Sequence, residues 1–142
     1  MKTLSLTIVA ILFITKVHAQ SANVDSATVV NLKRFFARNI RYPAIAREND
    51  LQGTVVVTFK IDSNQNISDI KIIKSLSPEC DADVLRVFLA YRQPLPLSPA
   101  EYTAGITFLI EGENRKNKIV PFDKSLYRNF LFEGRIIMVR EN

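Results

Sequence analysis

The chain has 142 residues, of which 47% are hydrophobic and 23% charged, and its formal net charge at neutral pH is +5. This composition indicates one folded domain with a modest core, and the two signs of charge are interspersed, so nothing requires a nucleic-acid partner. The chain contains one histidine and one cysteine. A single cysteine excludes an intramolecular disulfide, and the scarcity of both residues leaves no good zinc or iron site. We therefore expect no metal, no cofactor and no nucleic acid.

The first residues have the layout of a secretory signal peptide. Lys2 precedes an apolar run from Leu4 to Ile14, and Ala19 ends an A-x-A-like cleavage site. The run is too short to cross a hydrocarbon layer of about 30 Å comfortably. We expect residues 1–19 to be removed on export, and the alternative is an uncleaved leader that stays anchored in the inner membrane.

Two helices are predicted next. Asp25 or Ser26 can cap the first, whose apolar stripe follows a spacing of three and four residues: Val29, Leu32, Phe36 and Ile40. Pro43 suits the first turn of a second, short helix that continues to Glu48. We expect the first helix to pack on a sheet as core, and the alternative is an amphipathic helix that binds a partner.

A hairpin is predicted after the short helix. Apolar side chains occupy alternate positions in residues 53–62, which predicts a strand with one strongly apolar face. Residues 62–66 are of the types that bend a chain, with Asn66 suited to positive φ. Residues 67–75 predict the second strand, and their imperfect alternation indicates a bulge or a strand covered on both faces.

A helix and a third strand complete this region. Ser77 and Pro78 supply an N-cap and a first-turn proline, and the acidic residues that follow favour the positive end of the helix dipole. Three prolines then end the helix, and residues 102–110 predict an apolar strand. The predicted core consists of apolar side chains from these elements: Leu32, Phe36, Val55, Val57, Phe59, Ile70, Ile72, Leu85 and Phe88.

Signals for catalysis are weak. Without residues 1–19 the chain has no histidine, and so no ordinary nucleophile–base pair. Asp81 and Asp83 point to different sides of a helix, so capping explains them better than acid–base chemistry. Cys80 is expected to be a small buried residue, and the alternatives are an intermolecular disulfide or a thiol activated by the helix N-terminus. We expect that the protein is not an enzyme; converging carboxylates or a perturbed lysine would indicate one.

The order of these signals is similar to that of a known family. Tyr42-Pro43, the alternating strand led by Gly53 and the acidic helix start at Asp81 together resemble the C-terminal domain of TonB, over about residues 35–111. The resemblance implies an α+β fold with two or three helices packed on one face of a small, mainly antiparallel sheet. It also implies a periplasmic domain that binds an outer-membrane receptor in TonB-dependent transport.

The resemblance further implies how the partner is bound. In TonB-like domains an extended receptor peptide adds to the free edge of the last strand, through main-chain hydrogen bonds. Carried over to this sequence, the partner-binding positions lie in that strand and in the surface near Tyr42 and Pro43; those in the strand are Thr103, Ala104, Gly105, Ile106, Thr107, Phe108, Leu109 and Ile110.

The end of the chain lies beyond the resemblance. Residues 136–139 predict a strand because they are β-branched or apolar between charged flanks. If that strand pairs with residues 103–110, it covers the edge that a receptor peptide needs; otherwise the edge is open. We divide the chain into the signal peptide, residues 1–19, a TonB-like domain, residues 20–111, and an extension, residues 112–142.

The sequence predicts neither the membrane anchor nor the long proline-rich spacer of a complete TonB protein. We therefore expect a free-standing interaction module. The alternative is a structural envelope protein that binds peptidoglycan or self-associates as a homodimer.

Overall fold

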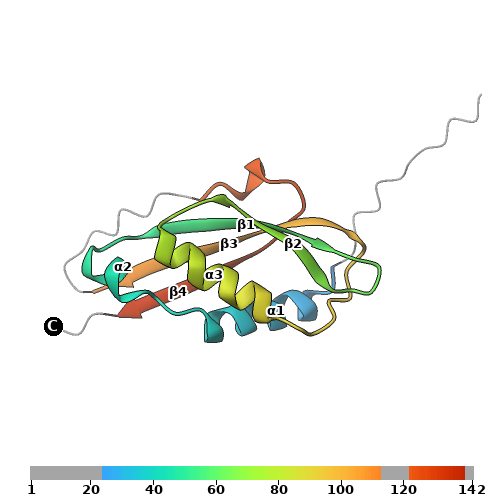
Figure 1. Ribbon diagram of the computed structural model, residues 1–142, viewed down its shortest axis with the longest axis horizontal. Helices are drawn as coiled ribbons and strands as arrows, with labels where there is room; N and C mark the ends of the chain where they lie inside the picture. The colour runs from blue at the N-terminus through green and yellow to red at the C-terminus, as the bar shows by residue number, and fades with distance from the viewer. Residues whose placement is uncertain (1–23, 113–121, 140–142) are drawn as a thin grey trace, which may run out of the picture.

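The computed structural model describes residues 24–112 and 122–139 (Figure 1). The predicted signal peptide lies outside the described residues. The helices and strands follow in chain order: α1 (Ser26–Asn39), α2 (Ala44–Glu48), β1 (Gly53–Ile61), β2 (Ile67–Lys74), α3 (Pro78–Ala90), β3 (Ala100–Glu111), the 3-10 helix η1 (Lys124–Leu126) and β4 (Phe130–Val139).

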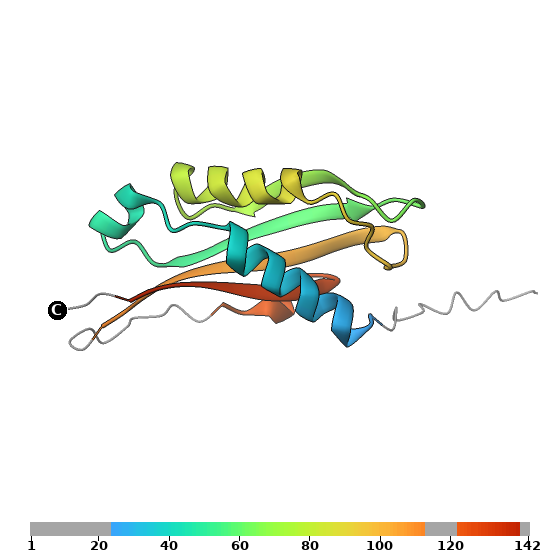
Figure 2. The same ribbon diagram turned by 90° about the horizontal axis from the view of Figure 1, so that it is seen from below.

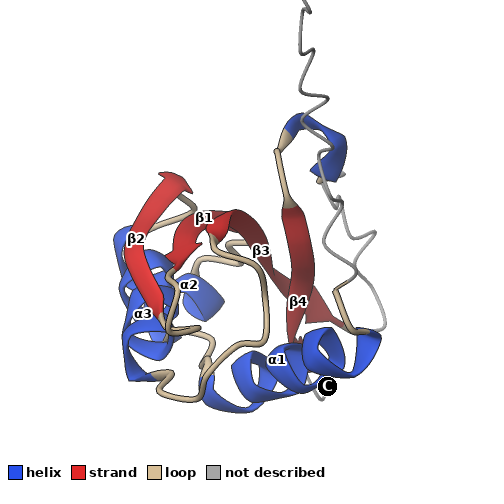
Figure 3. Cartoon of the chain, turned by 90° about the vertical axis from the view of Figure 1, so that its right-hand side faces the viewer, coloured by secondary structure: helices blue, strands red, loops and turns tan. Residues whose placement is uncertain are grey.

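The four strands form one sheet in the order β2-β1-β3-β4. β1 is antiparallel to both of its neighbours, whereas β4 runs parallel to β3. A parallel neighbour needs a crossover connection, which explains the long stretch of chain between β3 and β4. The α-helices lie on one face of the sheet, and η1 stands away from them (Figures 2 and 3). The predicted α+β architecture is confirmed.

The main core lies between the helices and the sheet. Phe36 of α1 is fully buried, with ring centroids 4.3 Å from Phe88 of α3 and 5.4 Å from Phe132 of β4. Six of the predicted core residues are buried: Leu32, Phe36, Val55, Val57, Phe59 and Phe88.

The other three predicted core residues are less covered than expected. Ile70 and Ile72 are half-buried at the margin of the core, because β2 is an edge strand. Leu85 is only partly buried, because it does not lie on the buried face of α3. The residues on that face are Cys80, Val84, Val87 and Phe88.

The predicted starts of α1 and α3 are confirmed, whereas α2 begins one residue after Pro43, which is its N-cap. The Asp25 carboxylate accepts a hydrogen bond from the backbone N–H of Ala27 at 3.2 Å, at the start of α1. The Ser77 hydroxyl accepts one from Cys80 N–H at 3.2 Å, and Pro78 is the first residue of α3. Within residues 24–112 and 122–139, no helix is both long and apolar enough to cross a membrane.

The hairpin turn differs from the expectation in one residue. Positive φ falls on Gln65, at 65°, and not on Asn66. The carbonyl of Asn66 accepts a hydrogen bond from Asp62 N–H at 3.1 Å, so Asn66 already belongs to the hydrogen-bonded end of the hairpin and the turn lies before it. The predicted irregularity in β2 is confirmed by two shifts in its register against β1.

The acidic residues of α3 have structural partners. Asp83 Oδ2 accepts a hydrogen bond from Arg41 N–H at 2.6 Å, and Arg86 donates to the carbonyl of Asn39 at 2.9 Å. Asp81 Oδ1 accepts from Leu76 N–H at 3.1 Å. The contacts of Asp83 and Arg86 fasten the end of α1 to α3, which fixes where the chain enters α2.

Candidate functional site

The predicted partner-binding strand is central in the sheet. Its eight residues, Thr103 to Ile110, all lie in β3, which pairs with β1 on one side and with β4 on the other. The pairing with β4 extends from Thr103 to Glu111. Of the two alternatives that the sequence left open, the structure shows the covered edge, because the C-terminal extension occupies the side of β3 that β1 leaves free.

β4 is held in place by the main core. Phe132 is 2% exposed and lies opposite Ala104, and Ile136 is 7% exposed and lies opposite Phe108. Gly134, between them, leaves room for Ile106, whose Cδ1 would be 3.1 Å from an added Cβ. The alternation Phe132, Gly134, Ile136 was the sequence signal for a strand longer than residues 136–139.

The predicted contact residues Tyr42 and Pro43 lie away from β4's outer side. The Tyr42 ring meets Phe108 edge-on with centroids 5.2 Å apart, and its hydroxyl donates a hydrogen bond to the carbonyl of Leu51. Pro43 precedes the first residue of α2. Tyr42 thus anchors the chain around α2 to the helix-covered side of β3.

The sheet has two edges, and the β2 edge is charged and irregular. Asp69 has φ of 48° and pairs with Lys60 at 2.7 Å and with Lys71 at 3.2 Å. The hydrogen bond from Lys60, and then that from Lys71, lowers the pKa of Asp69, while the same Lys60 contact raises the pKa of Lys60. Bulges and charged side chains are features that discourage another strand from pairing.

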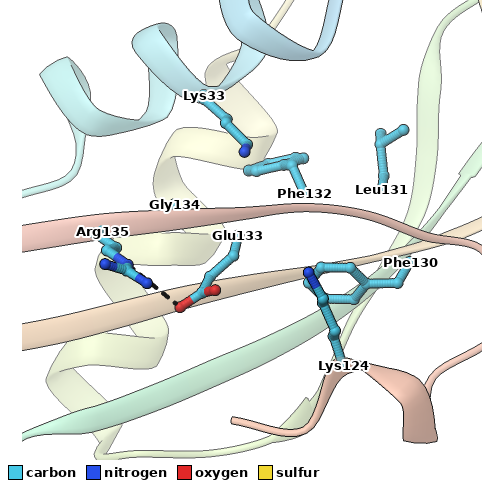
Figure 4. Close-up of a pocket in the computed structure, with 8 residues that line it drawn as sticks. All are labelled: Lys33, Lys124, Phe130, Leu131, Phe132, Glu133, Gly134 and Arg135. Carbon is cyan, nitrogen blue, oxygen red and sulfur yellow. Dashed lines mark ion pairs between the residues drawn. The ribbon is translucent and has the colours of Figure 1, made fainter. Parts of the chain in front are cut away.

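The β4 edge carries a groove of about 650 Å³ (Figure 4). Six consecutive residues of β4 line it, from Phe130 to Arg135, together with one lysine from each flank. Lys33 comes from α1, above β4 in the view, and Lys124 comes from η1, below it. The groove therefore runs along the strand edge between elements that lie on opposite faces of the sheet.

The groove has an excess of positive charge. Glu133, the one acidic lining residue in the described part of the chain, accepts a hydrogen bond from Thr107 Oγ1 at 3.0 Å and lies 3.7 Å from Nε of Arg135. Lys33 and Lys124 are exposed, and neither forms an ion pair with the part of the chain that the structure describes. The groove can therefore attract a negatively charged ligand from both flanks.

Aromatic packing positions the η1 side of the groove. The Phe122 ring lies 5.6 Å from that of Phe130 and 5.4 Å from that of Tyr127, centroid to centroid. Phe122 also covers Gly105 so closely that an added Cβ would be 2.9 Å from its ring. Sequence reasoning missed this cluster because nothing local in the sequence places Phe122 over a strand residue far from it in the chain.

Cys80 is a buried structural residue. Cys80 is fully buried, and burial raises the pKa of its thiol, so activation by the helix N-terminus is not supported. Among the described residues, no three His, Cys, Asp or Glu side chains are grouped so that they could hold a metal ion.

Comparison with known proteins identifies the family. The family model described as Gram-negative bacterial TonB protein C-terminal matches residues 38–109, which include α2, β1, β2, α3 and most of β3. Among solved structures, the NMR solution structure of Helicobacter pylori TonB-CTD is similar, with 18% identity and a TM-score of 0.43, over 55% of this chain and 90% of that chain. No curated protein matches the sequence significantly.

Proposed function

This chain belongs to the TonB C-terminal family, and on that premise we propose that it is a periplasmic interaction domain that binds an extended segment of an outer-membrane receptor by strand addition. The observation that carries the proposal is the outer side of β4, an edge strand with a groove along it. An edge strand offers unpaired N–H and C=O groups to a peptide. The groove supplies surfaces for the side chains of that peptide.

The occupied side of β3 favours addition beside β4 over addition to β3 itself. A peptide could reach Thr103 to Ile110 only if β4 left the sheet, which would expose Phe132 and Ile136. Removing two such side chains from the core costs about 1.5 to 3 kcal/mol each, before the lost strand pairing is counted. A short flexible peptide gains little free energy in excess of its own ordering, so it would not offset that cost.

The β2 edge is the poorer of the two edges for a peptide. A peptide there would meet the ion pairs of Asp69 with Lys60 and Lys71, and a strand whose register against β1 is shifted twice. β4 has one register shift against β3, between Thr103 and Ala104, and pairs regularly from there to Glu111.

Backbone-methylated peptides test strand addition directly. The ligands are peptides of about ten residues, enough for one strand, from periplasm-facing segments of the receptors of the same organism. Each is made unmethylated, with alternate amides N-methylated, and with the complementary amides N-methylated. Since alternate amides of a strand face its neighbour, one methylated form should lose binding and the other should keep it.

Amide hydrogen exchange then locates the site. Bound peptide should slow exchange in β4 and leave β2 unchanged, because a newly paired amide exchanges only when the pair opens. Equal binding of both methylated forms, or protection confined to β2, would show that the peptide does not add to β4.

A further inference from the structure

We propose that the β4 groove selects extended peptides with two acidic side chains at an odd spacing, so that one carboxylate meets Lys33 and the other meets Lys124. The inference deepens the proposed function and rests on it, since it names the chemistry of the peptide that adds to β4. Both lysines and all of β4 lie outside the family match at residues 38–109, so the selectivity rests on residues that the match does not include.

The spacing follows from where the lysines stand. Lys33 extends from α1 over the face of β4 that carries Phe132, and Lys124 extends from η1 on the face that carries Phe130 (Figure 4). Successive side chains of an added strand point to opposite faces of the sheet. Two acidic residues at an odd spacing therefore point to opposite faces, one toward each lysine, whereas an even spacing places both on the same face.

The charges in the groove make acidic residues the favoured partners. Lys33 and Lys124 are exposed and have no ion pair within the described residues, so a ligand carboxylate displaces no partner from that part of the chain. Glu133 would repel an acid on the Lys124 face, but its carboxylate already lies beside Thr107 and Arg135. The remaining charge of the groove is positive.

The strand beyond the groove indicates what the rest of the peptide carries. Ile137 is 49% exposed and Val139 is 66% exposed, and both are on the face of β4 that also carries Arg135. Facing side chains of neighbouring strands stabilise a sheet best when apolar residues meet apolar ones. The selected ligand is therefore a strand with an acidic portion and a β-branched or aromatic portion.

The test measures the affinity of three synthetic peptides for the purified protein by fluorescence anisotropy. They share a Val/Thr backbone of about ten residues and carry two Asp at an odd spacing, two Asp at an even spacing, or two Asn. Equal net charge in the first two peptides removes general electrostatic attraction as a cause. The odd-spaced peptide should bind about two- to fivefold more tightly than the even-spaced one, which is the range of one additional exposed ion pair.

Single-lysine variants test the two contacts. Lys33→Gln and Lys124→Gln should each abolish the difference in affinity between odd and even spacing. Each variant keeps a single lysine in the groove, and both peptides can place one carboxylate beside it. Lys74→Gln, which neutralises an exposed lysine on the β2 edge, should preserve the difference. Folding of each variant is checked by its unfolding midpoint, which these exposed substitutions should not shift.

The outcomes separate this inference from the proposed function. If the three synthetic peptides bind equally while receptor peptides still show the alternating methylation pattern, the spacing rule is overturned and strand addition stands. If no synthetic or receptor peptide binds, both are overturned. Lysine-dependent binding of peptidoglycan fragments without any preference among peptides, or a dimer that buries the β4 edge, would also overturn the spacing rule.

Discussion

The two edges of the sheet use opposite chemistry. At the β2 edge, Asp69 has positive φ and holds two lysines, and side chains on both faces are exposed or half-exposed. At the β4 edge, one face is fixed in the core through Phe132 and Ile136, and a groove with an excess of positive charge runs along the strand. Both β2 and β4 are edge strands of this sheet, so the residues of each edge decide which one can accept a peptide.

The two edge strands also reach the sheet differently. β2 follows β1 through a tight turn, whereas β4 returns parallel to β3 after a crossover that passes Phe122 and η1. A short turn keeps β2 beside β1, whereas a parallel neighbour is joined only by a long crossover and so depends more on the packing of its own side chains. β4 should therefore be the edge whose loss damages the fold more.

Truncation of Phe132 tests that difference and has the largest expected effect. Phe132→Ala should lower the free energy of unfolding by about 3 to 5 kcal/mol, because it leaves a cavity beside Phe36. Ile73→Ala on β2, where the side chain is 50% exposed, should cost less than about 1 kcal/mol. Urea denaturation measures both. Similar losses would mean that β4 is not held more firmly than β2.

The contact of Phe122 with Gly105 gives a smaller effect. Gly105→Ala places a Cβ 2.9 Å from the Phe122 ring and should cost about 1 to 3 kcal/mol through overpacking. Phe122→Leu combined with Gly105→Ala should cost less than the sum of the two single changes, because the smaller side chain makes room. If the two losses of unfolding free energy were strictly additive, Phe122 would not be packed tightly against Gly105.

The smallest effect concerns pH at the β2 edge. The hydrogen bond from Lys60 keeps the pKa of Asp69 below its ordinary value, so its stabilising contribution is present above the unfolded-state pKa and is lost as pH falls through the folded-state pKa. Lys60→Met should raise the Asp69 midpoint in an NMR titration, and Lys74→Met should leave it unchanged. If the Asp69 midpoint were unaltered in Lys60→Met, the contact with Lys60 would not be what lowers the pKa of Asp69.

Local patterns in the sequence predicted most of the fold. Alternation from Val55 to Ile61, the Ser77-Pro78 helix start and the stripe around Phe36 each depend on neighbours within a few residues, so they can be read directly. The resemblance to TonB named the family correctly for the same reason, since its signals lie in the matched segment.

Local sequence patterns could not predict that β4 forms the edge of the sheet beside β3. The resemblance ended before β4, and whether a C-terminal strand pairs with β3 depends on contacts of Phe132 and Ile136 with distant residues. The lysines of the groove come from α1 and η1, which no local pattern places on either side of one strand. The resemblance therefore placed the binding site on β3, although β4 of the same chain pairs with the side of β3 that a peptide would need.

A disulfide between β3 and β4 tests the central claim most directly. Thr107 and Arg135 are paired across the two strands, so Thr107→Cys with Arg135→Cys can tie β4 to β3, while buried Cys80 stays unreactive. The same receptor peptide is titrated into the oxidised and the reduced forms of this variant. We predict equal affinity for both forms, because the peptide adds to the outer side of β4. Binding by the reduced form alone would contradict the account, since it would show that β4 must leave before the partner can bind.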